Sequence, residues 1–169
     1  MKKLIALLMV LTIFLSFTAC GGEEITLQSQ TVYDLTLDVP SDFGEFSEVA
    51  EQIKMAKNED NTATITVSER VDAQGVTADL WDQETFIANV LSGFGDLEVL
   101  EFSNTEAVAG TTAVFSHYIA KNSGDVEVEG YNYFLYHTNG TYQSVAFSFT
   151  KGNDTSLKQN LTAIIESMK

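Results

Sequence analysis

The sequence predicts an α+β fold, in which an antiparallel β-sheet of about six to seven strands is covered by two main helices (an α/β sandwich). Three observations carry this prediction. Apolar and polar residues alternate in several segments, which is typical of half-buried strands. Two other segments space their apolar residues at helical intervals. Turn sequences separate consecutive strands, and sequential hairpins force neighbouring strands to run antiparallel.

The first expected strand covers residues 32–39, where apolar residues take the odd positions from Tyr33 onward. Pro40, the only proline, ends this strand. Residues 46–56 fit either a helix or a strand. Residues 62–69 are β-branched and alternate clearly, and a polar turn precedes them. We therefore expect a hairpin that joins residues 52–57 to residues 62–69.

The first helix is expected over residues 77–91, followed by Gly93 and Gly95, which would end it. Its apolar stripe consists of Leu80, Ile87, Val90 and Leu91. Four strands are expected next, over residues 97–103, 111–120, 126–138 and 141–150. The last helix is expected over residues 155–168, with Asp154 as its N-cap.

The N-terminus has the features of an export signal. Lys2 and Lys3 give it a positive start, and residues 4–17 form an almost unbroken apolar run. This run of about 14 residues is shorter than the ~20 that a membrane-spanning helix needs. We therefore expect a signal peptide over residues 1–19 rather than a transmembrane anchor.

Phe17-Thr18-Ala19-Cys20 resembles the lipobox of bacterial lipoproteins. The resemblance implies that Cys20 is lipidated and anchors the mature protein to the extracytoplasmic face of the cell membrane. The alternative is an ordinary secretory signal followed by a chance cysteine. If Cys20 is lipidated, residues 20–30 are the lipidated cysteine and a short tether, and residues 31–169 are a single domain. Because Cys20 is the only cysteine, no disulfide framework can form.

The charge of the chain is strongly acidic. It has 24 acidic and 9 basic residues, and its formal net charge is −15. Removal of the signal peptide would also remove two lysines and leave −17. Such a surface repels nucleic acid and anionic lipid headgroups, so neither is expected to bind the domain. An acidic surface is compatible with binding of cations or basic partners, and it also favours solubility at a crowded surface.

The segment from Tyr33 to Phe43, which reads Tyr-Asp-Leu-Thr-Leu-Asp-Val-Pro-Ser-Asp-Phe, resembles the opening strand of the PsbP-like fold family. Val39 stands where that family has an aromatic residue, and Phe43 where tryptophan is common. The order of strands and helices is also similar, although cystatin-like or nuclear-transport-factor-like lipoproteins would share it. The family has no common catalytic motif, so the resemblance implies a binding or assembly role.

The residues give no sign of an enzyme or of a cofactor. The only histidines are His117 and His137, and both fall in expected strands. No nucleophile elbow, dinucleotide fingerprint or phosphate loop is present. The histidines lack zinc-ligand spacing, and the acidic turn at residues 58–61 lacks the pattern of a calcium loop. We therefore expect no catalytic residue, no metal site and no cofactor.

The last expected hairpin carries the candidate binding residues. Asn139-Gly140 favours a two-residue type I′ turn, in which Thr138 opposes Thr141. In that register Val145 lies on the core face, and a tyrosine-rich face lies opposite. The residues proposed to line a binding surface there are Tyr131, Tyr133, His137 and Tyr142. The alternative is that a helix covers this face and that only the hydroxyl groups reach its rim.

Three functions remain open at this point. The first is a lipid-anchored binding or assembly module that contacts an unknown protein or small molecule. The second is a carrier of a small ligand or metal that serves a transporter, which would need an enclosed pocket lined by the Tyr and His residues. The third is an enzyme, which would need His117 or His137 beside a carboxylate in a cleft.

Overall fold

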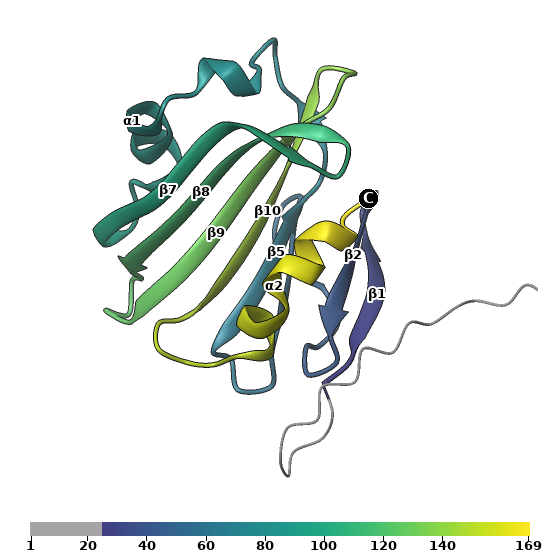
Figure 1. The fold of residues 1–169 in the computed structure, drawn as a ribbon, viewed down its shortest axis with the longest axis vertical. Coiled ribbons are helices and arrows are strands. Elements are labelled where there is room, and N and C mark those ends of the chain that lie inside the picture. The colour runs from purple at the N-terminus through teal and green to yellow at the C-terminus, as the bar shows by residue number, and fades with distance from the viewer. Residues whose placement is uncertain (1–24) are drawn as a thin grey trace, which may run out of the picture.

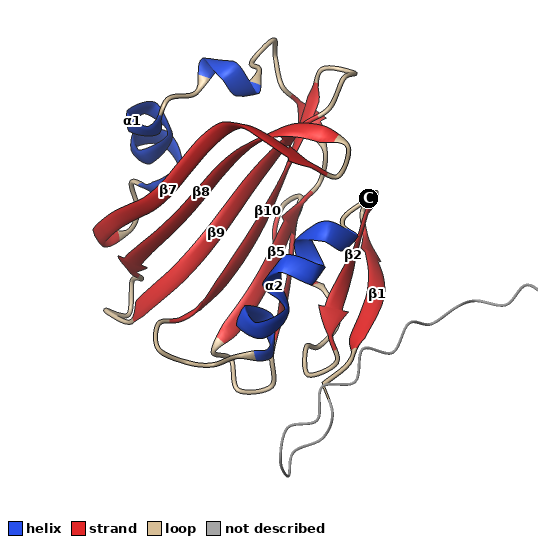
Figure 2. Ribbon diagram, in the orientation of Figure 1, coloured by secondary structure: helices blue, strands red, loops and turns tan. Residues whose placement is uncertain are grey.

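The computed structural model describes residues 25–169. The expected signal peptide and Cys20 lie outside these residues. The described chain folds into a large antiparallel sheet, a separate two-stranded hairpin and helices on both faces of the sheet (Figures 1 and 2). The predicted α+β class is confirmed.

The main sheet has the strand order β3-β4-β5-β10-β9-β8-β7, and the two-residue strand β6 pairs with β10 beside β5. Its strands are β3 (Ser47–Ala50), β4 (Ile53–Lys57), β5 (Ala63–Ser68), β6 (Val71–Asp72), β7 (Gly95–Val108), β8 (Thr111–Lys121), β9 (Glu127–Tyr136) and β10 (Thr141–Thr150). All of their pairings are antiparallel. The expected hairpin between residues 52–57 and 62–69 is confirmed as β4 and β5.

The N-terminal hairpin differs from the single strand expected over residues 32–39. Strands β1 (Leu27–Val32) and β2 (Leu35–Pro40) pair across a turn in which Tyr33 takes a positive φ of 56°. The apolar alternation therefore describes β2, and Tyr33 belongs to the turn instead of the strand. Residues 27–30, which were expected to lie in the tether, form part of β1.

Helix α2 (Ser156–Ser167) packs against β2 and lies over the middle of the sheet (Figure 1). Its buried apolar side chains are Leu157, Leu161 and Ile164. The N-cap is Thr155 rather than the expected Asp154, because the Thr155 side chain accepts a hydrogen bond from the Lys158 N–H (3.2 Å).

The segment expected as one helix over residues 77–91 is divided into three. It consists of a 3-10 helix η1 (Ala78–Leu80), a short α-helix α1 (Gln83–Phe86) and a π-helical turn η2 (Ile87–Leu91). The break follows from Trp81, which is extended, and Asp82, which caps α1 by accepting from the Thr85 N–H (2.7 Å). Leu80 is 63% exposed and does not belong to the apolar stripe expected for it.

Two apolar clusters lie on opposite faces of the sheet. The larger one joins α2 and the β1–β2 hairpin to the sheet through residues such as Leu37, Ile65 and Phe147. The smaller one packs Phe86 and Leu91 against β8. In the part of the chain that the structure describes, no helix has the length and apolar character needed to cross a membrane.

Candidate functional site

The last hairpin does not have the register expected from its Asn-Gly sequence. The turn holds three residues, because His137 N–H donates to Thr141 O (2.9 Å) and Gly140 N–H donates to His137 O (3.1 Å). Gly140 takes a left-handed φ of 78°, which suits the last position of a three-residue loop. The pairing of β9 with β10 is therefore shifted by one residue from the expected register, and that prediction is wrong.

A shift of one residue exchanges the two faces of a strand, so the four candidate residues are separated. Tyr131 and Tyr133 lie on the face of α2, and Tyr133 is only 6% exposed. Tyr142 lies on the opposite face, where its ring stacks on that of Phe134 (6.0 Å between centroids). His137 stands at the loop. The expectation that these residues share one surface is therefore wrong, while their role in binding stays a prediction.

The structure instead joins Tyr131 to the other histidine. His117 in β8 and Glu129 in β9 approach to 2.9 Å between Nε2 and Oε1. The Tyr131 hydroxyl donates to the same oxygen (3.1 Å), and Lys158 of α2 donates from Nζ to Oε2 (3.2 Å). The rings of His117 and Tyr131 stack with their centroids 4.1 Å apart. We call these four residues the Glu129 cluster.

The neighbours in this cluster shift the pKa values of Glu129 and Tyr131. Burial alone would raise the pKa of Glu129, but hydrogen bonds from His117, Lys158 and Tyr131 outweigh it and hold that pKa below its ordinary value. Burial and the charge of Glu129 raise the pKa of the Tyr131 phenol. The carboxylate of Glu129 is therefore held ionised and the phenol of Tyr131 protonated.

Among residues 25–169, the side chain of His117 bonds to Glu129 and to no serine, threonine or cysteine that it could activate. Within the same residues, no group of three or more side chains of the metal-binding types is found together.

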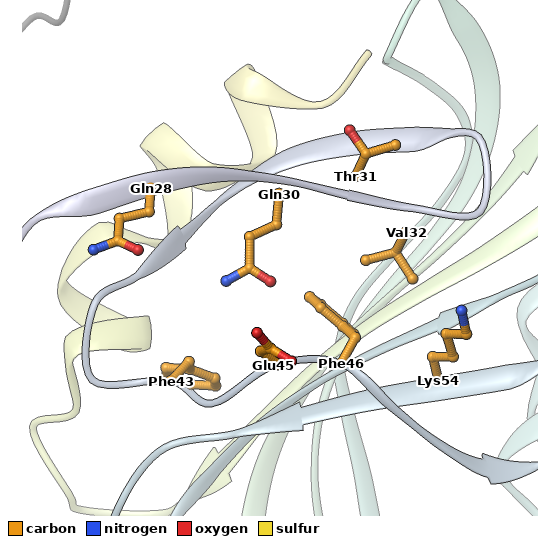
Figure 3. A pocket seen from close by; sticks show the side chains of 8 residues that line it. All are labelled: Gln28, Gln30, Thr31, Val32, Phe43, Glu45, Phe46 and Lys54. Atoms are coloured by element: carbon orange, nitrogen blue, oxygen red, sulfur yellow. The ribbon is translucent and has the colours of Figure 1, made fainter.

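An open cleft separates the β1–β2 hairpin from the edge of the main sheet (Figure 3). Its volume is about 520 Å³. The side chains of Gln28 and Gln30 point into it from β1, and those of Glu45 and Phe46 point toward them from the opposite wall. The remaining lining residues are Thr31, Val32, Phe43 and Lys54. None of the four tyrosine and histidine residues expected at a binding surface lines this cleft.

A polar cluster fixes the tip of the same hairpin to the sheet. The carboxylate of Asp34 accepts from Arg70 Nη2 (2.8 Å) and from Gln143 Nε2 (3.2 Å). Gln143 also donates to the carbonyl of Ser68 (2.9 Å) and is fully buried. Burial and the nearby charge of Arg70 lower the pKa of His137, which stands beside this cluster, while Asp34 partly opposes that effect.

Comparison with known proteins identifies the fold. No family model and no curated protein matches the sequence. The chain is similar to the solution structure of cyanobacterial PsbP (CyanoP) from Synechocystis, at 13% identity and a TM-score of 0.61, over 90% of this chain and 97% of that one. It is also similar to the Ran-binding protein Mog1p of Saccharomyces cerevisiae, at 14% identity and a TM-score of 0.57, over 86% of this chain and 95% of that one. The fold is PsbP-like. At such identities the likeness shows the fold alone.

Two features of this PsbP-like domain were not predicted from the sequence. Glu129 was not identified as a functional residue from the sequence, although the Asn122–Asp125 turn could have indicated how its strand pairs. Closing that hairpin with Lys121 opposite Glu127 sets the register that brings His117 beside Tyr131. The cleft was missed because β1 was assigned to the tether, and no sequence pattern indicates a space between two sheets.

Proposed function

We propose that this protein is a lipid-anchored binding or assembly module at the extracytoplasmic face of a membrane. The export signal and the sequence around Cys20 support the anchor. The PsbP-like fold supports the binding role by analogy, since one solved relative is described as a Ran-binding protein. A non-catalytic role agrees with the Glu129 cluster, in which both carboxylate oxygens already accept hydrogen bonds.

The open cleft is the observation that carries this proposal. It brings amide, carboxylate, ammonium and aromatic side chains to one accessible place. The side chains of Gln28, Gln30 and Glu45 form no hydrogen bond with another residue of the described chain. Polar groups above a partly apolar floor are typical of binding sites, where the polar groups provide specificity.

The carrier of a small ligand is the second candidate, and the size of the cleft favours it. A volume of about 520 Å³ lies within the range of small-molecule sites. However, the cleft is open to solvent, whereas carrier sites bury most of their ligand. A bound small molecule that copurifies with the protein and is released on unfolding would favour the carrier over the assembly module.

The anchor is tested by metabolic labelling with an alkyne-bearing fatty acid. We expect the wild-type protein to be labelled and to sediment with membranes. Cys20→Ser should lose the label and leave the membrane fraction. Labelling of Cys20→Ser at the wild-type level would contradict lipidation at this residue.

The binding role is tested by chemical crosslinking on intact cells. An affinity tag inserted in the exposed turn at Ser123–Gly124 leaves both ends of the chain unchanged. We expect one reproducible partner to be captured by the wild-type protein and much less of it by Cys20→Ser at equal abundance. A pattern of capture that varies among repeats would contradict the assembly module.

A further inference from the structure

The β1–β2 hairpin has one open edge, strand β1, and one closed edge, strand β2. On one side β1 pairs with β2, and on its other side no described strand pairs with it. The far side of β2 is different. Thr36 and Lys169 exchange two backbone hydrogen bonds (3.1 and 3.0 Å), and Asp38 N–H donates to Ser167 Oγ (2.8 Å). The hairpin is therefore filled on one side and open on the side of the cleft.

The other two open edges of the described structure carry features that block strand addition. Strand β7 has three register shifts and carries four acidic residues, Asp96, Glu98, Glu101 and Glu106. Strand β3 has four residues and one register shift. Bulges, charges and shortness are the ordinary protections of sheet edges. Strand β1 has none of them, since its six residues, Leu-Gln-Ser-Gln-Thr-Val, are uncharged and pair with β2 without a shift.

The hydrogen-bond pattern identifies the free groups of β1. In an antiparallel pair, every second residue exchanges hydrogen bonds with the partner strand. Ser41 N–H donates to Thr26 O (2.8 Å), so the even-numbered residues of β1 face β2. The backbone N–H and C=O groups of Ser29 and Thr31 therefore point away from β2, as a template for one more strand.

The cleft continues from this edge. The side chains of Gln28 and Gln30 project from β1 into it, opposite Phe46 (Figure 3). Phe43 and Val32, both buried, form part of its floor. A strand added beside β1 would point every second side chain toward this floor. Lys54 and Glu45 supply one charge of each sign at the walls.

We propose that β1 binds an extended segment of a partner protein as an additional strand, whose inward side chains fill the cleft. This inference rests on the proposed binding function and specifies its mode. The segment would be neutral or basic overall, because the described residues carry 22 acidic and 7 basic side chains. The same charge makes a second copy of this chain an unfavourable occupant.

The position of β1 in the sequence also limits where the partner segment lies. Leu27 is seven residues beyond Cys20, a distance of at most roughly 25 Å in an extended chain. If Cys20 carries the lipid, β1 lies close to the membrane surface. The partner segment would therefore be a membrane-proximal, extracytoplasmic part of a membrane protein.

The test combines site-specific photocrosslinking with an edge block, in the full-length protein on living cells. A photoreactive amino acid replaces Gln28, which is exposed and lines the cleft. A second protein also carries Ser29→Pro, which removes one outward N–H and should leave the fold intact. A photoreactive residue at the exposed Thr112 serves as the control position. We expect an adduct from position 28 alone and at least a tenfold loss of it with Ser29→Pro.

A second variant and a direct measurement protect this test against misfolding. Ser29→Lys places a charge on the same edge and should also reduce the adduct. The crosslinked partner segment, identified by mass spectrometry and made as a peptide, is then added to the purified full-length protein in detergent. Binding as a strand should slow the hydrogen exchange of the Ser29 and Thr31 amides by at least tenfold. The Gln30 amide, which already faces β2, should change little.

Each other result overturns the inference. An undiminished adduct in folded Ser29→Pro excludes strand addition, and so does unchanged exchange at Ser29 and Thr31 on peptide binding. If the adduct joins two copies of this chain, β1 mediates self-association and the proposed partner protein is excluded. If position 28 gives no adduct while general crosslinking captures a partner, binding by strand addition is contradicted and the proposed binding function is supported. If neither method captures anything, both proposals fail.

Discussion

The ring of Tyr118 lies over Gly130, its pairing partner across strands β8 and β9. A Cβ atom at position 130 would overlap Cζ and Oη of that ring. Tyr118 is only 4% exposed, and burial raises the pKa of its phenol to about 12. The ring therefore stays neutral and fixed, and glycine is the residue that leaves room for it.

Gly130→Ala should lower the free energy of unfolding by about 1–3 kcal/mol, because the added methyl group must displace a packed ring or the backbone. Urea unfolding followed by circular dichroism measures this. Gly93→Ala is the control, since no atom lies within 4 Å of the added Cβ there, and it should change stability by less than about 0.5 kcal/mol. Equal effects of the two changes would contradict the close approach of Tyr118.

Glu129→Gln should lower stability at pH 7 by about 1–3 kcal/mol, because the charged acceptor of three hydrogen bonds is lost. The pKa of Glu129 is depressed in the folded state, so its contribution is present above the ordinary value of 4.5 and is lost as the pH falls through the folded value. The difference in unfolding free energy between Glu129→Gln and the wild type should therefore become smaller at acidic pH.

The control for this change is Glu127→Gln, which alters an exposed ion pair with Lys151 and should cost less than about 1 kcal/mol. Unfolding free energies measured from pH 7 to pH 3 compare the two variants. A gap between Glu129→Gln and wild type that widens toward low pH would show that the carboxylate is not held ionised by its neighbours.

His137 should titrate below its ordinary pKa of 6.5, because burial and the charge of Arg70 disfavour the imidazolium. A depressed pKa in the folded state means that stability is complete above pH 6.5 and is lost as the pH falls toward the folded value. NMR titration of the imidazole signals measures the midpoint directly. His137→Asn should remove this part of the pH dependence, and a midpoint at or above 6.5 would be incompatible with the burial described here.

Leu91→Ala should lower stability by about 2–5 kcal/mol, because Leu91 is 1% exposed and its removal leaves a cavity against β8. Leu80→Ala removes the same atoms from a side chain that is 63% exposed, so it should change stability by less than about 0.5 kcal/mol. Both leucines would face the core if residues 77–91 formed one amphipathic helix. Thermal unfolding of the two variants distinguishes these structures, since similar losses would favour the single helix.

Local sequence patterns were sufficient to predict an element where its formation depends only on its own residues. The strand at residues 141–150 and the hairpin of β4 and β5 have the expected bounds to within two residues. The last helix also agrees, although its cap lies one residue later. The helix expected over residues 77–91 is continuous only over residues 83–91, because Asp82 caps a new helix there and this capping overrides the apolar spacing.

The candidate sites depend on pairing between segments, which local patterns do not determine. One additional residue in the turn, with Gly140 in the left-handed region, changed the register and moved Tyr142 to the other face. Strand β1 gave no signal, since Leu27 and Val32 are its only apolar residues and its partner lies across a turn at Tyr33. The Glu129 cluster joins two strands and a helix, so it follows only from the assembled sheet.

The pairing of β5 with β10 has a consequence for how fast the domain can form. Val67 and Val145 are neighbours in the sheet but are separated by roughly 80 residues of chain. Closing so long a loop precedes any gain from the contact, and folds dominated by such pairs are slow to form. The half-sheet containing β3, β4 and β5 stays without its central neighbour until β10 has emerged. Until then the folding chain exposes the unpaired edge of β5, which other chains can bind.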